Sequence, residues 1–175
     1  MKHFGKLLQS VFILSLITSH ISSVQAQNEL PLWPEGIPNN PVQYNAELVR
    51  TNEVNASSLS KQNRVFSRVS EPTYTLYKAK KELANGIALV ICPGGGFRDV
   101  WFDREGADFA LWLAQKGITS LVLKYRTFNP DSENFTLERG VYDAEVYADA
   151  KQAIHILRSQ SEYLKIDKNK IGIAG

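Results

Sequence analysis

Apolar residues in this chain occur as short unbroken runs and as one-sided stripes, and the two patterns alternate. Residues 87–92 are six apolar positions in a row, stopped by Pro93 and three glycines. Such a run is typical of a strand buried on both faces of a parallel sheet. Residues 118–125, in which 121–123 are apolar without a break, predict a second strand, and residues 171–175 predict the start of a third.

A helical stripe separates the first two predicted strands. Ala107, Ala110, Leu111 and Ala114 lie at i, i+3, i+4 and i+7, which predicts a helix over 105–116, and Gly117 provides its C-terminal cap. The connection is long enough for a crossover, so the order strand–helix–strand predicts a right-handed parallel unit.

A longer helix is expected over 138–163. Its apolar stripe consists of Val146, Ala150, Ala153, Ile154 and Leu157. The carboxylates of this helix are assigned to its solvated face; they include Glu138, Asp143, Glu145 and Asp149.

The amino-terminal part is less regular. Residues 30–41 contain four prolines, which predicts an extended segment over the surface. Residues 46–64 are polar and predict a loop, whereas the aromatic and β-branched residues of 65–78 predict one or two antiparallel edge strands. The expected divisions are a leader at 1–26, an extended segment at 27–64, and an α/β domain at 65–175.

The leader has the three parts of a secretory signal peptide. Lys2, His3 and Lys6 form a basic start, residues 7–17 are apolar and too short to span a bilayer, and 24–26 offer a cleavage site. The protein is therefore expected to be secreted or periplasmic, with no membrane association after the leader is removed.

Composition excludes several classes of function. The chain has 20 Lys and Arg, two of them in the leader, so 18 remain against 18 Asp and Glu, and no nucleic-acid partner is expected. The single cysteine, Cys92, cannot form an internal disulfide and is interpreted as a small buried residue. No metal-ligand spacing occurs, so neither metal nor cofactor is expected. His155, the one histidine after the leader, is expected on the surface.

The glycines after the first strand leave three interpretations open. Residues 93–97 could form an oxyanion-hole loop that offers bare backbone N–H groups. They could instead cradle a phosphate, although Asp99 stands where a dinucleotide motif has its third glycine. The third interpretation is a tight turn whose glycines serve geometry only.

Several segments together resemble the α/β-hydrolase superfamily, and within it the secreted bacterial carbohydrate esterases of the acetylxylan-esterase and feruloyl-esterase kind. The resemblance covers nearly all of the chain after the leader. The matching segments are 32–36, 90–97, 105–106, 112–114, 117, 122–126, 149–150, 153–154, 158, 166–167 and 171–175. The departures are Pro93, where many esterases have histidine, and residues 132–141, which match poorly.

The resemblance implies a three-layer α/β-hydrolase sandwich, of which the chain is the amino-terminal part, and a carboxylic ester hydrolase acting on acylated carbohydrate. The backbone N–H groups of Gly95 and Gly96 would hold the oxyanion, and Gly175 would be the first glycine of the nucleophile elbow. The serine, acid and histidine would all follow Gly175, so these residues alone are expected to be inactive. Alternatives are a peptidase or lipase of the same fold, or a binding module without catalysis.

Overall fold

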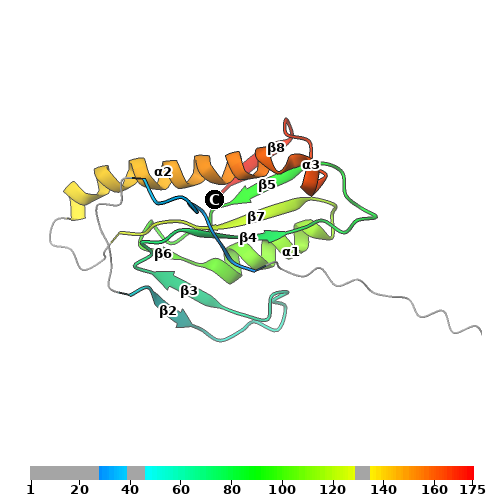
Figure 1. The fold of residues 1–175 in the computed structure, drawn as a ribbon. Coiled ribbons are helices and arrows are strands. Elements are labelled where there is room, and N and C mark those ends of the chain that lie inside the picture. The colour runs from blue at the N-terminus through cyan, green and yellow to red at the C-terminus, as the bar shows by residue number, and fades with distance from the viewer. Residues whose placement is uncertain (1–27, 39–45, 129–134) are drawn as a thin grey trace, which may run out of the picture.

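The protein folds as an α/β sandwich whose central sheet carries one helix layer on each face (Figure 1). The computed structural model describes residues 28–38, 46–128 and 135–175. The predicted leader lies outside these ranges. Among the described residues, no helix is both long and apolar enough to cross a membrane.

The main sheet has five strands in the order β1-β4-β7-β5-β8. The strands are β1 (Leu30–Pro31), β4 (Thr73–Tyr77), β7 (Thr119–Lys124), β5 (Ala88–Ile91) and β8 (Ile171–Ala174). β5 pairs in parallel with both β7 and β8, whereas β1 and β4 extend the sheet with antiparallel pairing. The predicted parallel strands are confirmed, and β5 lies between the other two.

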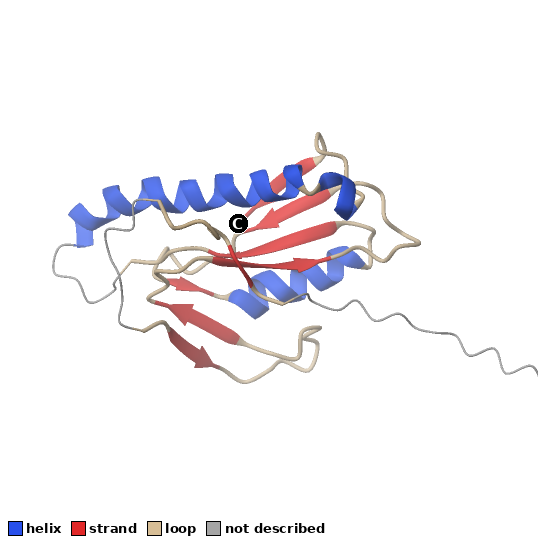
Figure 2. Cartoon of the chain, in the orientation of Figure 1, coloured by secondary structure: helices blue, strands red, loops and turns tan. Residues whose placement is uncertain are grey.

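Two helical layers enclose this sheet (Figure 2). A π-helical turn, η1 (Phe102–Ala107), continues into α1 (Asp108–Ala114), and together they form the crossover between β5 and β7. α2 (Phe135–Ser159) and the short α3 (Ser161–Leu164) connect β7 to β8. The predicted unit of strand, helix and strand is confirmed, but the helix begins at Phe102, three residues before the predicted start.

Gly117 ends the first crossover as expected, with a φ of +82°. A Cβ at this position would lie 2.0 Å from the carbonyl oxygen of Leu83, so both the backbone conformation and the close approach require glycine.

A second, three-stranded sheet was not predicted. It is antiparallel, in the order β2 (Leu48–Thr51), β3 (Arg64–Ser67) and β6 (Asp99–Val100). The prediction of a loop throughout 46–64 is therefore wrong for β2. Its strand conformation comes from pairing with β3, a long-range contact that a local residue pattern does not show.

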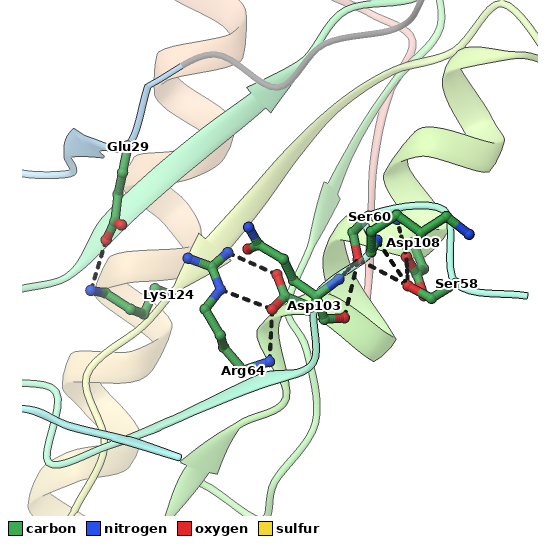
Figure 3. A network of polar contacts seen from close by, with 9 residues as sticks. Glu29, Ser58, Ser60, Arg64, Asp103, Asp108 and Lys124 are labelled. Carbon is green, nitrogen blue, oxygen red and sulfur yellow. Dashed lines mark hydrogen bonds and ion pairs between the residues drawn. The ribbon is translucent and has the colours of Figure 1, made fainter. Parts of the chain in front are cut away.

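An ion pair between the half-buried Arg64 and the buried Asp103 joins this small sheet to η1 (Figure 3). Asp103 is fully buried, and its carboxylate accepts hydrogen bonds from the backbone N–H of Arg64 at 2.7 Å and from its guanidinium at 2.8 and 2.9 Å. A second carboxylate, at the start of α1, makes a similar contact: Asp108 accepts a hydrogen bond from the Ser60 N–H at 2.6 Å. These two carboxylates hold the loop before β3 against the crossover helix.

The amino-terminal segment is more deeply integrated than its prolines predicted. β1 pairs with β4, and Leu32 is fully buried in the core. Because β1 lies outside β4, the prediction that the strand at 73–77 is an edge strand is wrong. Residues 39–41 of the predicted extended segment lie outside the described residues.

Candidate active site

The glycine loop lies at the edge of the sheet where the three parallel strands end. It follows β5 directly, and β5 is flanked by β7 and β8 in register: Ile91 is opposite Val122 on one side and Ala174 on the other. Open α/β sheets bind their ligands outside the carboxyl ends of their strands. The loop, Tyr125 after β7 and Gly175 after β8 therefore converge on one location.

Two backbone N–H groups of the loop are unpaired. Gly95 and Gly96 have φ values of +147° and +60°, in the left-handed region where glycine is favoured. Across the described parts of the chain, neither N–H has an acceptor within hydrogen-bonding distance. Gly95 is partly buried and Gly96 is exposed, so two adjacent N–H groups without a protein acceptor are open to a ligand, and the loop is a candidate anion-binding site.

The carbonyl groups of the same peptides are paired, and this fixes the direction of the free N–H groups. The Gly94 carbonyl accepts from the Trp101 N–H at 3.0 Å, and the Gly95 carbonyl accepts from the N–H groups of Arg98 and Asp99 at 3.2 and 3.1 Å. In a trans peptide the N–H points away from the carbonyl. The N–H groups of Gly95 and Gly96 therefore face away from the 98–101 turn.

Gly95 is required by the loop itself. A Cβ on Gly95 would lie 2.0 Å from the carbonyl oxygen of Asp99, whereas a Cβ on Gly96 would meet no atom within 4 Å. The first glycine thus permits the backbone of residue 99 to fold against the loop, and the second leaves its own N–H uncovered.

A cavity of about 350 Å³ lies in front of the loop. Its walls are mainly apolar and come from the loop, from α2 and from the end of β8. The lining residues are Cys92, Pro93, Gly94, Gly95, Gly96, Phe97, Tyr125, Val146, Tyr147, Ala150, Ile173, Ala174 and Gly175. Free N–H groups beside an apolar cavity can bind a developing negative charge strongly, because little water screens the interaction.

Gly175 packs closely against Cys92, the residue that follows β5. The N–H of Cys92 donates to the carbonyl of Ala174 at 2.8 Å, and a Cβ on Gly175 would lie 2.6 Å from the carbonyl oxygen of Cys92. Only a glycine permits this approach. The structure thus brings Gly95, Gly96 and Gly175, the three predicted site residues, to one cavity.

The peptide between Pro93 and Gly94 is held at both ends. The hydroxyl of Tyr125 donates to the Pro93 carbonyl at 2.7 Å, and the Gly94 N–H donates to Oε2 of Glu105 at 2.8 Å. Burial, then the nearby Cys92, Glu105 and Asp99, raise the pKa of Tyr125, so its phenol stays a neutral donor. Glu105 and Tyr125 both lie in segments that carry the family resemblance, but the sequence indicated no role for either residue.

A buried charge network stands behind the same edge of the sheet. The guanidinium of Arg126 binds both carboxylate oxygens of Asp149, and Trp33 Nε1 donates to that carboxylate at 2.8 Å. Glu145 also faces Arg126, at 3.6 Å; burial raises the pKa of its carboxyl, Arg126 opposes this, and Asp149 adds a smaller rise. The prediction that Glu145 and Asp149 are solvated is wrong, because both side chains are buried beside Arg126, which hydrogen-bonds Asp149 and lies at ion-pair distance from Glu145. The Glu138 side chain lies outside the described residues.

Other candidate residues lie apart from this chemistry. His155 is exposed on α2, as predicted. Cys92 is partly buried and lines the cavity, and burial raises the pKa of its thiol to about 11, so it is protonated at neutral pH. The described residues contain no group of three or more His, Cys, Asp or Glu arranged to hold a metal ion.

The arrangement defines a class of protein: an α/β fold with a glycine loop after a central parallel strand, beside a cavity at the carboxyl edge of the sheet. No protein-family model matches the chain. Over 94 residues it is 31% identical to an acetylxylan esterase of Xylanibacter ruminicola. The match covers 54% of this chain and 17% of that protein. The predicted resemblance to α/β-hydrolases of the carbohydrate-esterase kind is confirmed.

Solved structures with similar arrangements include two bacterial enzymes. One is an acetyl ester-xyloside bifunctional hydrolase from Caldicellulosiruptor lactoaceticus, with 26% identity and a TM-score of 0.49 over 83% of this chain and 41% of that one. Another is a carboxylesterase from Lactobacillus plantarum, with 19% identity and a TM-score of 0.44 over 73% of this chain and 41% of that one. The chain thus spans less than half the length of each of these proteins.

Proposed function

We propose that the complete protein containing this chain is a secreted serine hydrolase that cleaves carboxylic esters. Its proposed substrates are acetyl esters of plant polysaccharide of the xylan type, or of the derived oligosaccharides. The observation that carries the proposal is the pair of unpaired N–H groups at Gly95 and Gly96, beside a cavity at the carboxyl edge of the sheet. The acetylxylan esterase relative supports the choice of substrate.

In the proposed mechanism, a serine two residues after Gly175 attacks the ester carbonyl. A histidine accepts the serine proton as the new C–O bond forms, and then donates it to the departing sugar hydroxyl. Water hydrolyses the resulting acyl-enzyme by the same route. In both steps the N–H groups of Gly95 and Gly96 bind the carbonyl oxygen as it becomes negative, and one such donor contributes about 3 kcal/mol to transition-state stabilisation.

Export follows from the leader in this proposal. Residues 1–26 direct secretion and are removed, so that the enzyme meets its polymeric substrate outside the cell or in the periplasm. The carbohydrate-esterase relative is in keeping with this location, because intact xylan does not enter cells.

The test is an assay of the complete protein on p-nitrophenyl acetate and on acetylated xylan. Release of p-nitrophenol and of acetate, both abolished when the elbow serine is replaced by alanine, is the expected result. A complete protein that releases neither product overturns the proposal and favours a binding module. Hydrolysis of peptides or of long-chain esters in place of acetyl esters would reject the substrate.

A further inference from the structure

The peptide group between Pro93 and Gly94 is anchored by two side chains from different elements. Its carbonyl accepts from the Tyr125 hydroxyl at 2.7 Å, and its N–H donates to Glu105 at 2.8 Å. Tyr125 follows β7, and Glu105 lies in the π-helical turn η1. This peptide immediately precedes the two that carry the free N–H groups of Gly95 and Gly96.

Rotation of this peptide by about half a turn would break both hydrogen bonds at once. The Tyr125 hydroxyl, which is buried, would lose its acceptor, and an unpaired buried donor is costly. The rotated carbonyl of Pro93 would also point towards the Glu105 carboxylate, which is an acceptor too. The two side chains therefore favour a single orientation of the peptide.

Close packing strengthens this selection. A Cβ on Gly94 would lie 2.6 Å from Oε2 of Glu105, so the carboxylate lies directly against the backbone. The Tyr125 ring also packs edge-on against Phe97, the residue after the glycines, with ring centroids 6.2 Å apart. Glu105 thus contacts the start of the loop at Gly94, and Tyr125 contacts its end at Phe97.

We propose that Glu105 and Tyr125 are positioning residues that clamp the Pro93–Gly94 peptide and thereby hold the Gly95 and Gly96 N–H groups in the orientation that binds the oxyanion. The inference rests on the proposed ester hydrolysis. Glu105 acts as a hydrogen-bond acceptor here, so glutamine, which keeps an acceptor oxygen, can replace it and alanine cannot.

The clamp predicts a selective effect on the transition state. In the complete enzyme, Glu105→Ala and Tyr125→Phe should each lower kcat at least about tenfold and leave KM within about twofold, since the bound ester makes its strongest contact with the loop only as charge develops. Affinity for a trifluoromethyl ketone, which forms a tetrahedral adduct, should fall in parallel with kcat/KM. Glu105→Gln should recover most of the activity.

Matched controls separate this role from a general loss of structure. Glu82→Ala removes an exposed carboxylate, and Tyr163→Phe removes an exposed hydroxyl, both away from the cavity. Thermal unfolding of every variant reports whether it is folded. If Glu105→Ala fails to fold, Tyr125→Phe still tests the clamp, because it removes only the hydroxyl and keeps the ring contact with Phe97.

Three results would overturn the clamp in an active enzyme: kcat within twofold of wild type for both variants, a change confined to KM, or glutamine no better than alanine at position 105. A wild-type enzyme without esterase activity would instead reject the proposed function, and the clamp with it.

Discussion

The carboxylate of Asp149 on α2 and the guanidinium of Arg126 after β7 form a bidentate pair with N–O distances of 2.8 and 3.0 Å, and neither side chain reaches solvent, at 0% and 1% exposure. The backbone N–H of Arg126 also donates to Asp149, and Trp33 donates from the amino-terminal segment. One buried carboxylate therefore connects three segments that are distant in sequence.

Replacing Asp149 by alanine should destabilise the protein strongly. Removing one partner of a buried ion pair leaves the other charge uncompensated and costs about 3 to 5 kcal/mol. Chemical denaturation should show a large fall in the unfolding midpoint for Asp149→Ala and almost none for Asp143→Asn, which changes a carboxylate of the same helix that has no interaction among the described residues. Equal midpoints for the two variants would contradict the pairing.

Gly95→Val should abolish ester hydrolysis in the complete protein. A Cβ at this position would lie 2.0 Å from the Asp99 carbonyl oxygen, so valine would force the loop out of its present conformation. Gly96→Ala meets no atom within 4 Å and needs only a left-handed alanine, which costs about 1 to 2 kcal/mol, so its loss of kcat should be much smaller. Turnover of p-nitrophenyl acetate measures both, and a reversed order would count against this loop geometry.

Glu29 should make the stability of the fold sensitive to acid. Burial raises the pKa of its carboxyl, but hydrogen bonds from Lys124 and Thr73 outweigh burial and lower the pKa below its ordinary value of 4.5. A lowered pKa in the folded state contributes stability above pH 4.5, and that stability is lost as the pH falls through the folded-state pKa. The ion pair with Lys124 that supplies this effect is visible in Figure 3.

Thermal unfolding of wild type and Glu29→Gln between pH 7 and about pH 3 checks this linkage. The variant should melt lower at neutral pH, and the difference should shrink below pH 4.5. Glu35→Gln serves as a control, since Glu35 is exposed and lies in the same amino-terminal segment. A difference that stays constant with pH would show that the charge of Glu29 contributes nothing.

Cys92 should react slowly with alkylating agents in the native protein. Burial raises the pKa of its thiol to about 11, so the reactive thiolate is scarce at neutral pH. Mass spectrometry of the peptide that contains Cys92, after timed treatment with iodoacetamide, should show slow labelling at pH 7.5 that accelerates as the pH rises. Rapid labelling at neutral pH, equal to that of the unfolded protein, would contradict this burial.

The parallel part of the main sheet was predictable because local residue patterns indicate its strands. β5 is an unbroken apolar run that ends before Pro93 and the glycines, the centre of β7 is the apolar triplet 121–123, and the α1 stripe with Gly117 defines the crossover between them. The small sheet was not predictable, since β2 is exposed at every position and β6 has only two residues. Both strands depend on pairing with β3.

The sequence indicated the glycines of the candidate site but not the residues that hold them in place. Gly95, Gly96 and Gly175 were indicated by a motif, whereas the partners of the loop were not. Glu105 lies 11 positions after Gly94, and Asp149 lies 23 positions after Arg126, so neither contact leaves a local signal. The helical pattern predicted that Asp149 faces solvent, because that pattern considers only where apolar residues recur along the helix. It cannot show that a buried arginine from another segment pairs with the carboxylate.

The two-residue strand β1 occupies the outer flank of β4, and it begins only four residues after the predicted cleavage point at Ala26. Without it, β4 would present a row of free main-chain donors and acceptors to other molecules, which invites strand-to-strand aggregation. If residues 1–26 are removed as proposed, cleavage a few residues further along would also remove β1 and leave β4 open to pairing with a second copy of the chain.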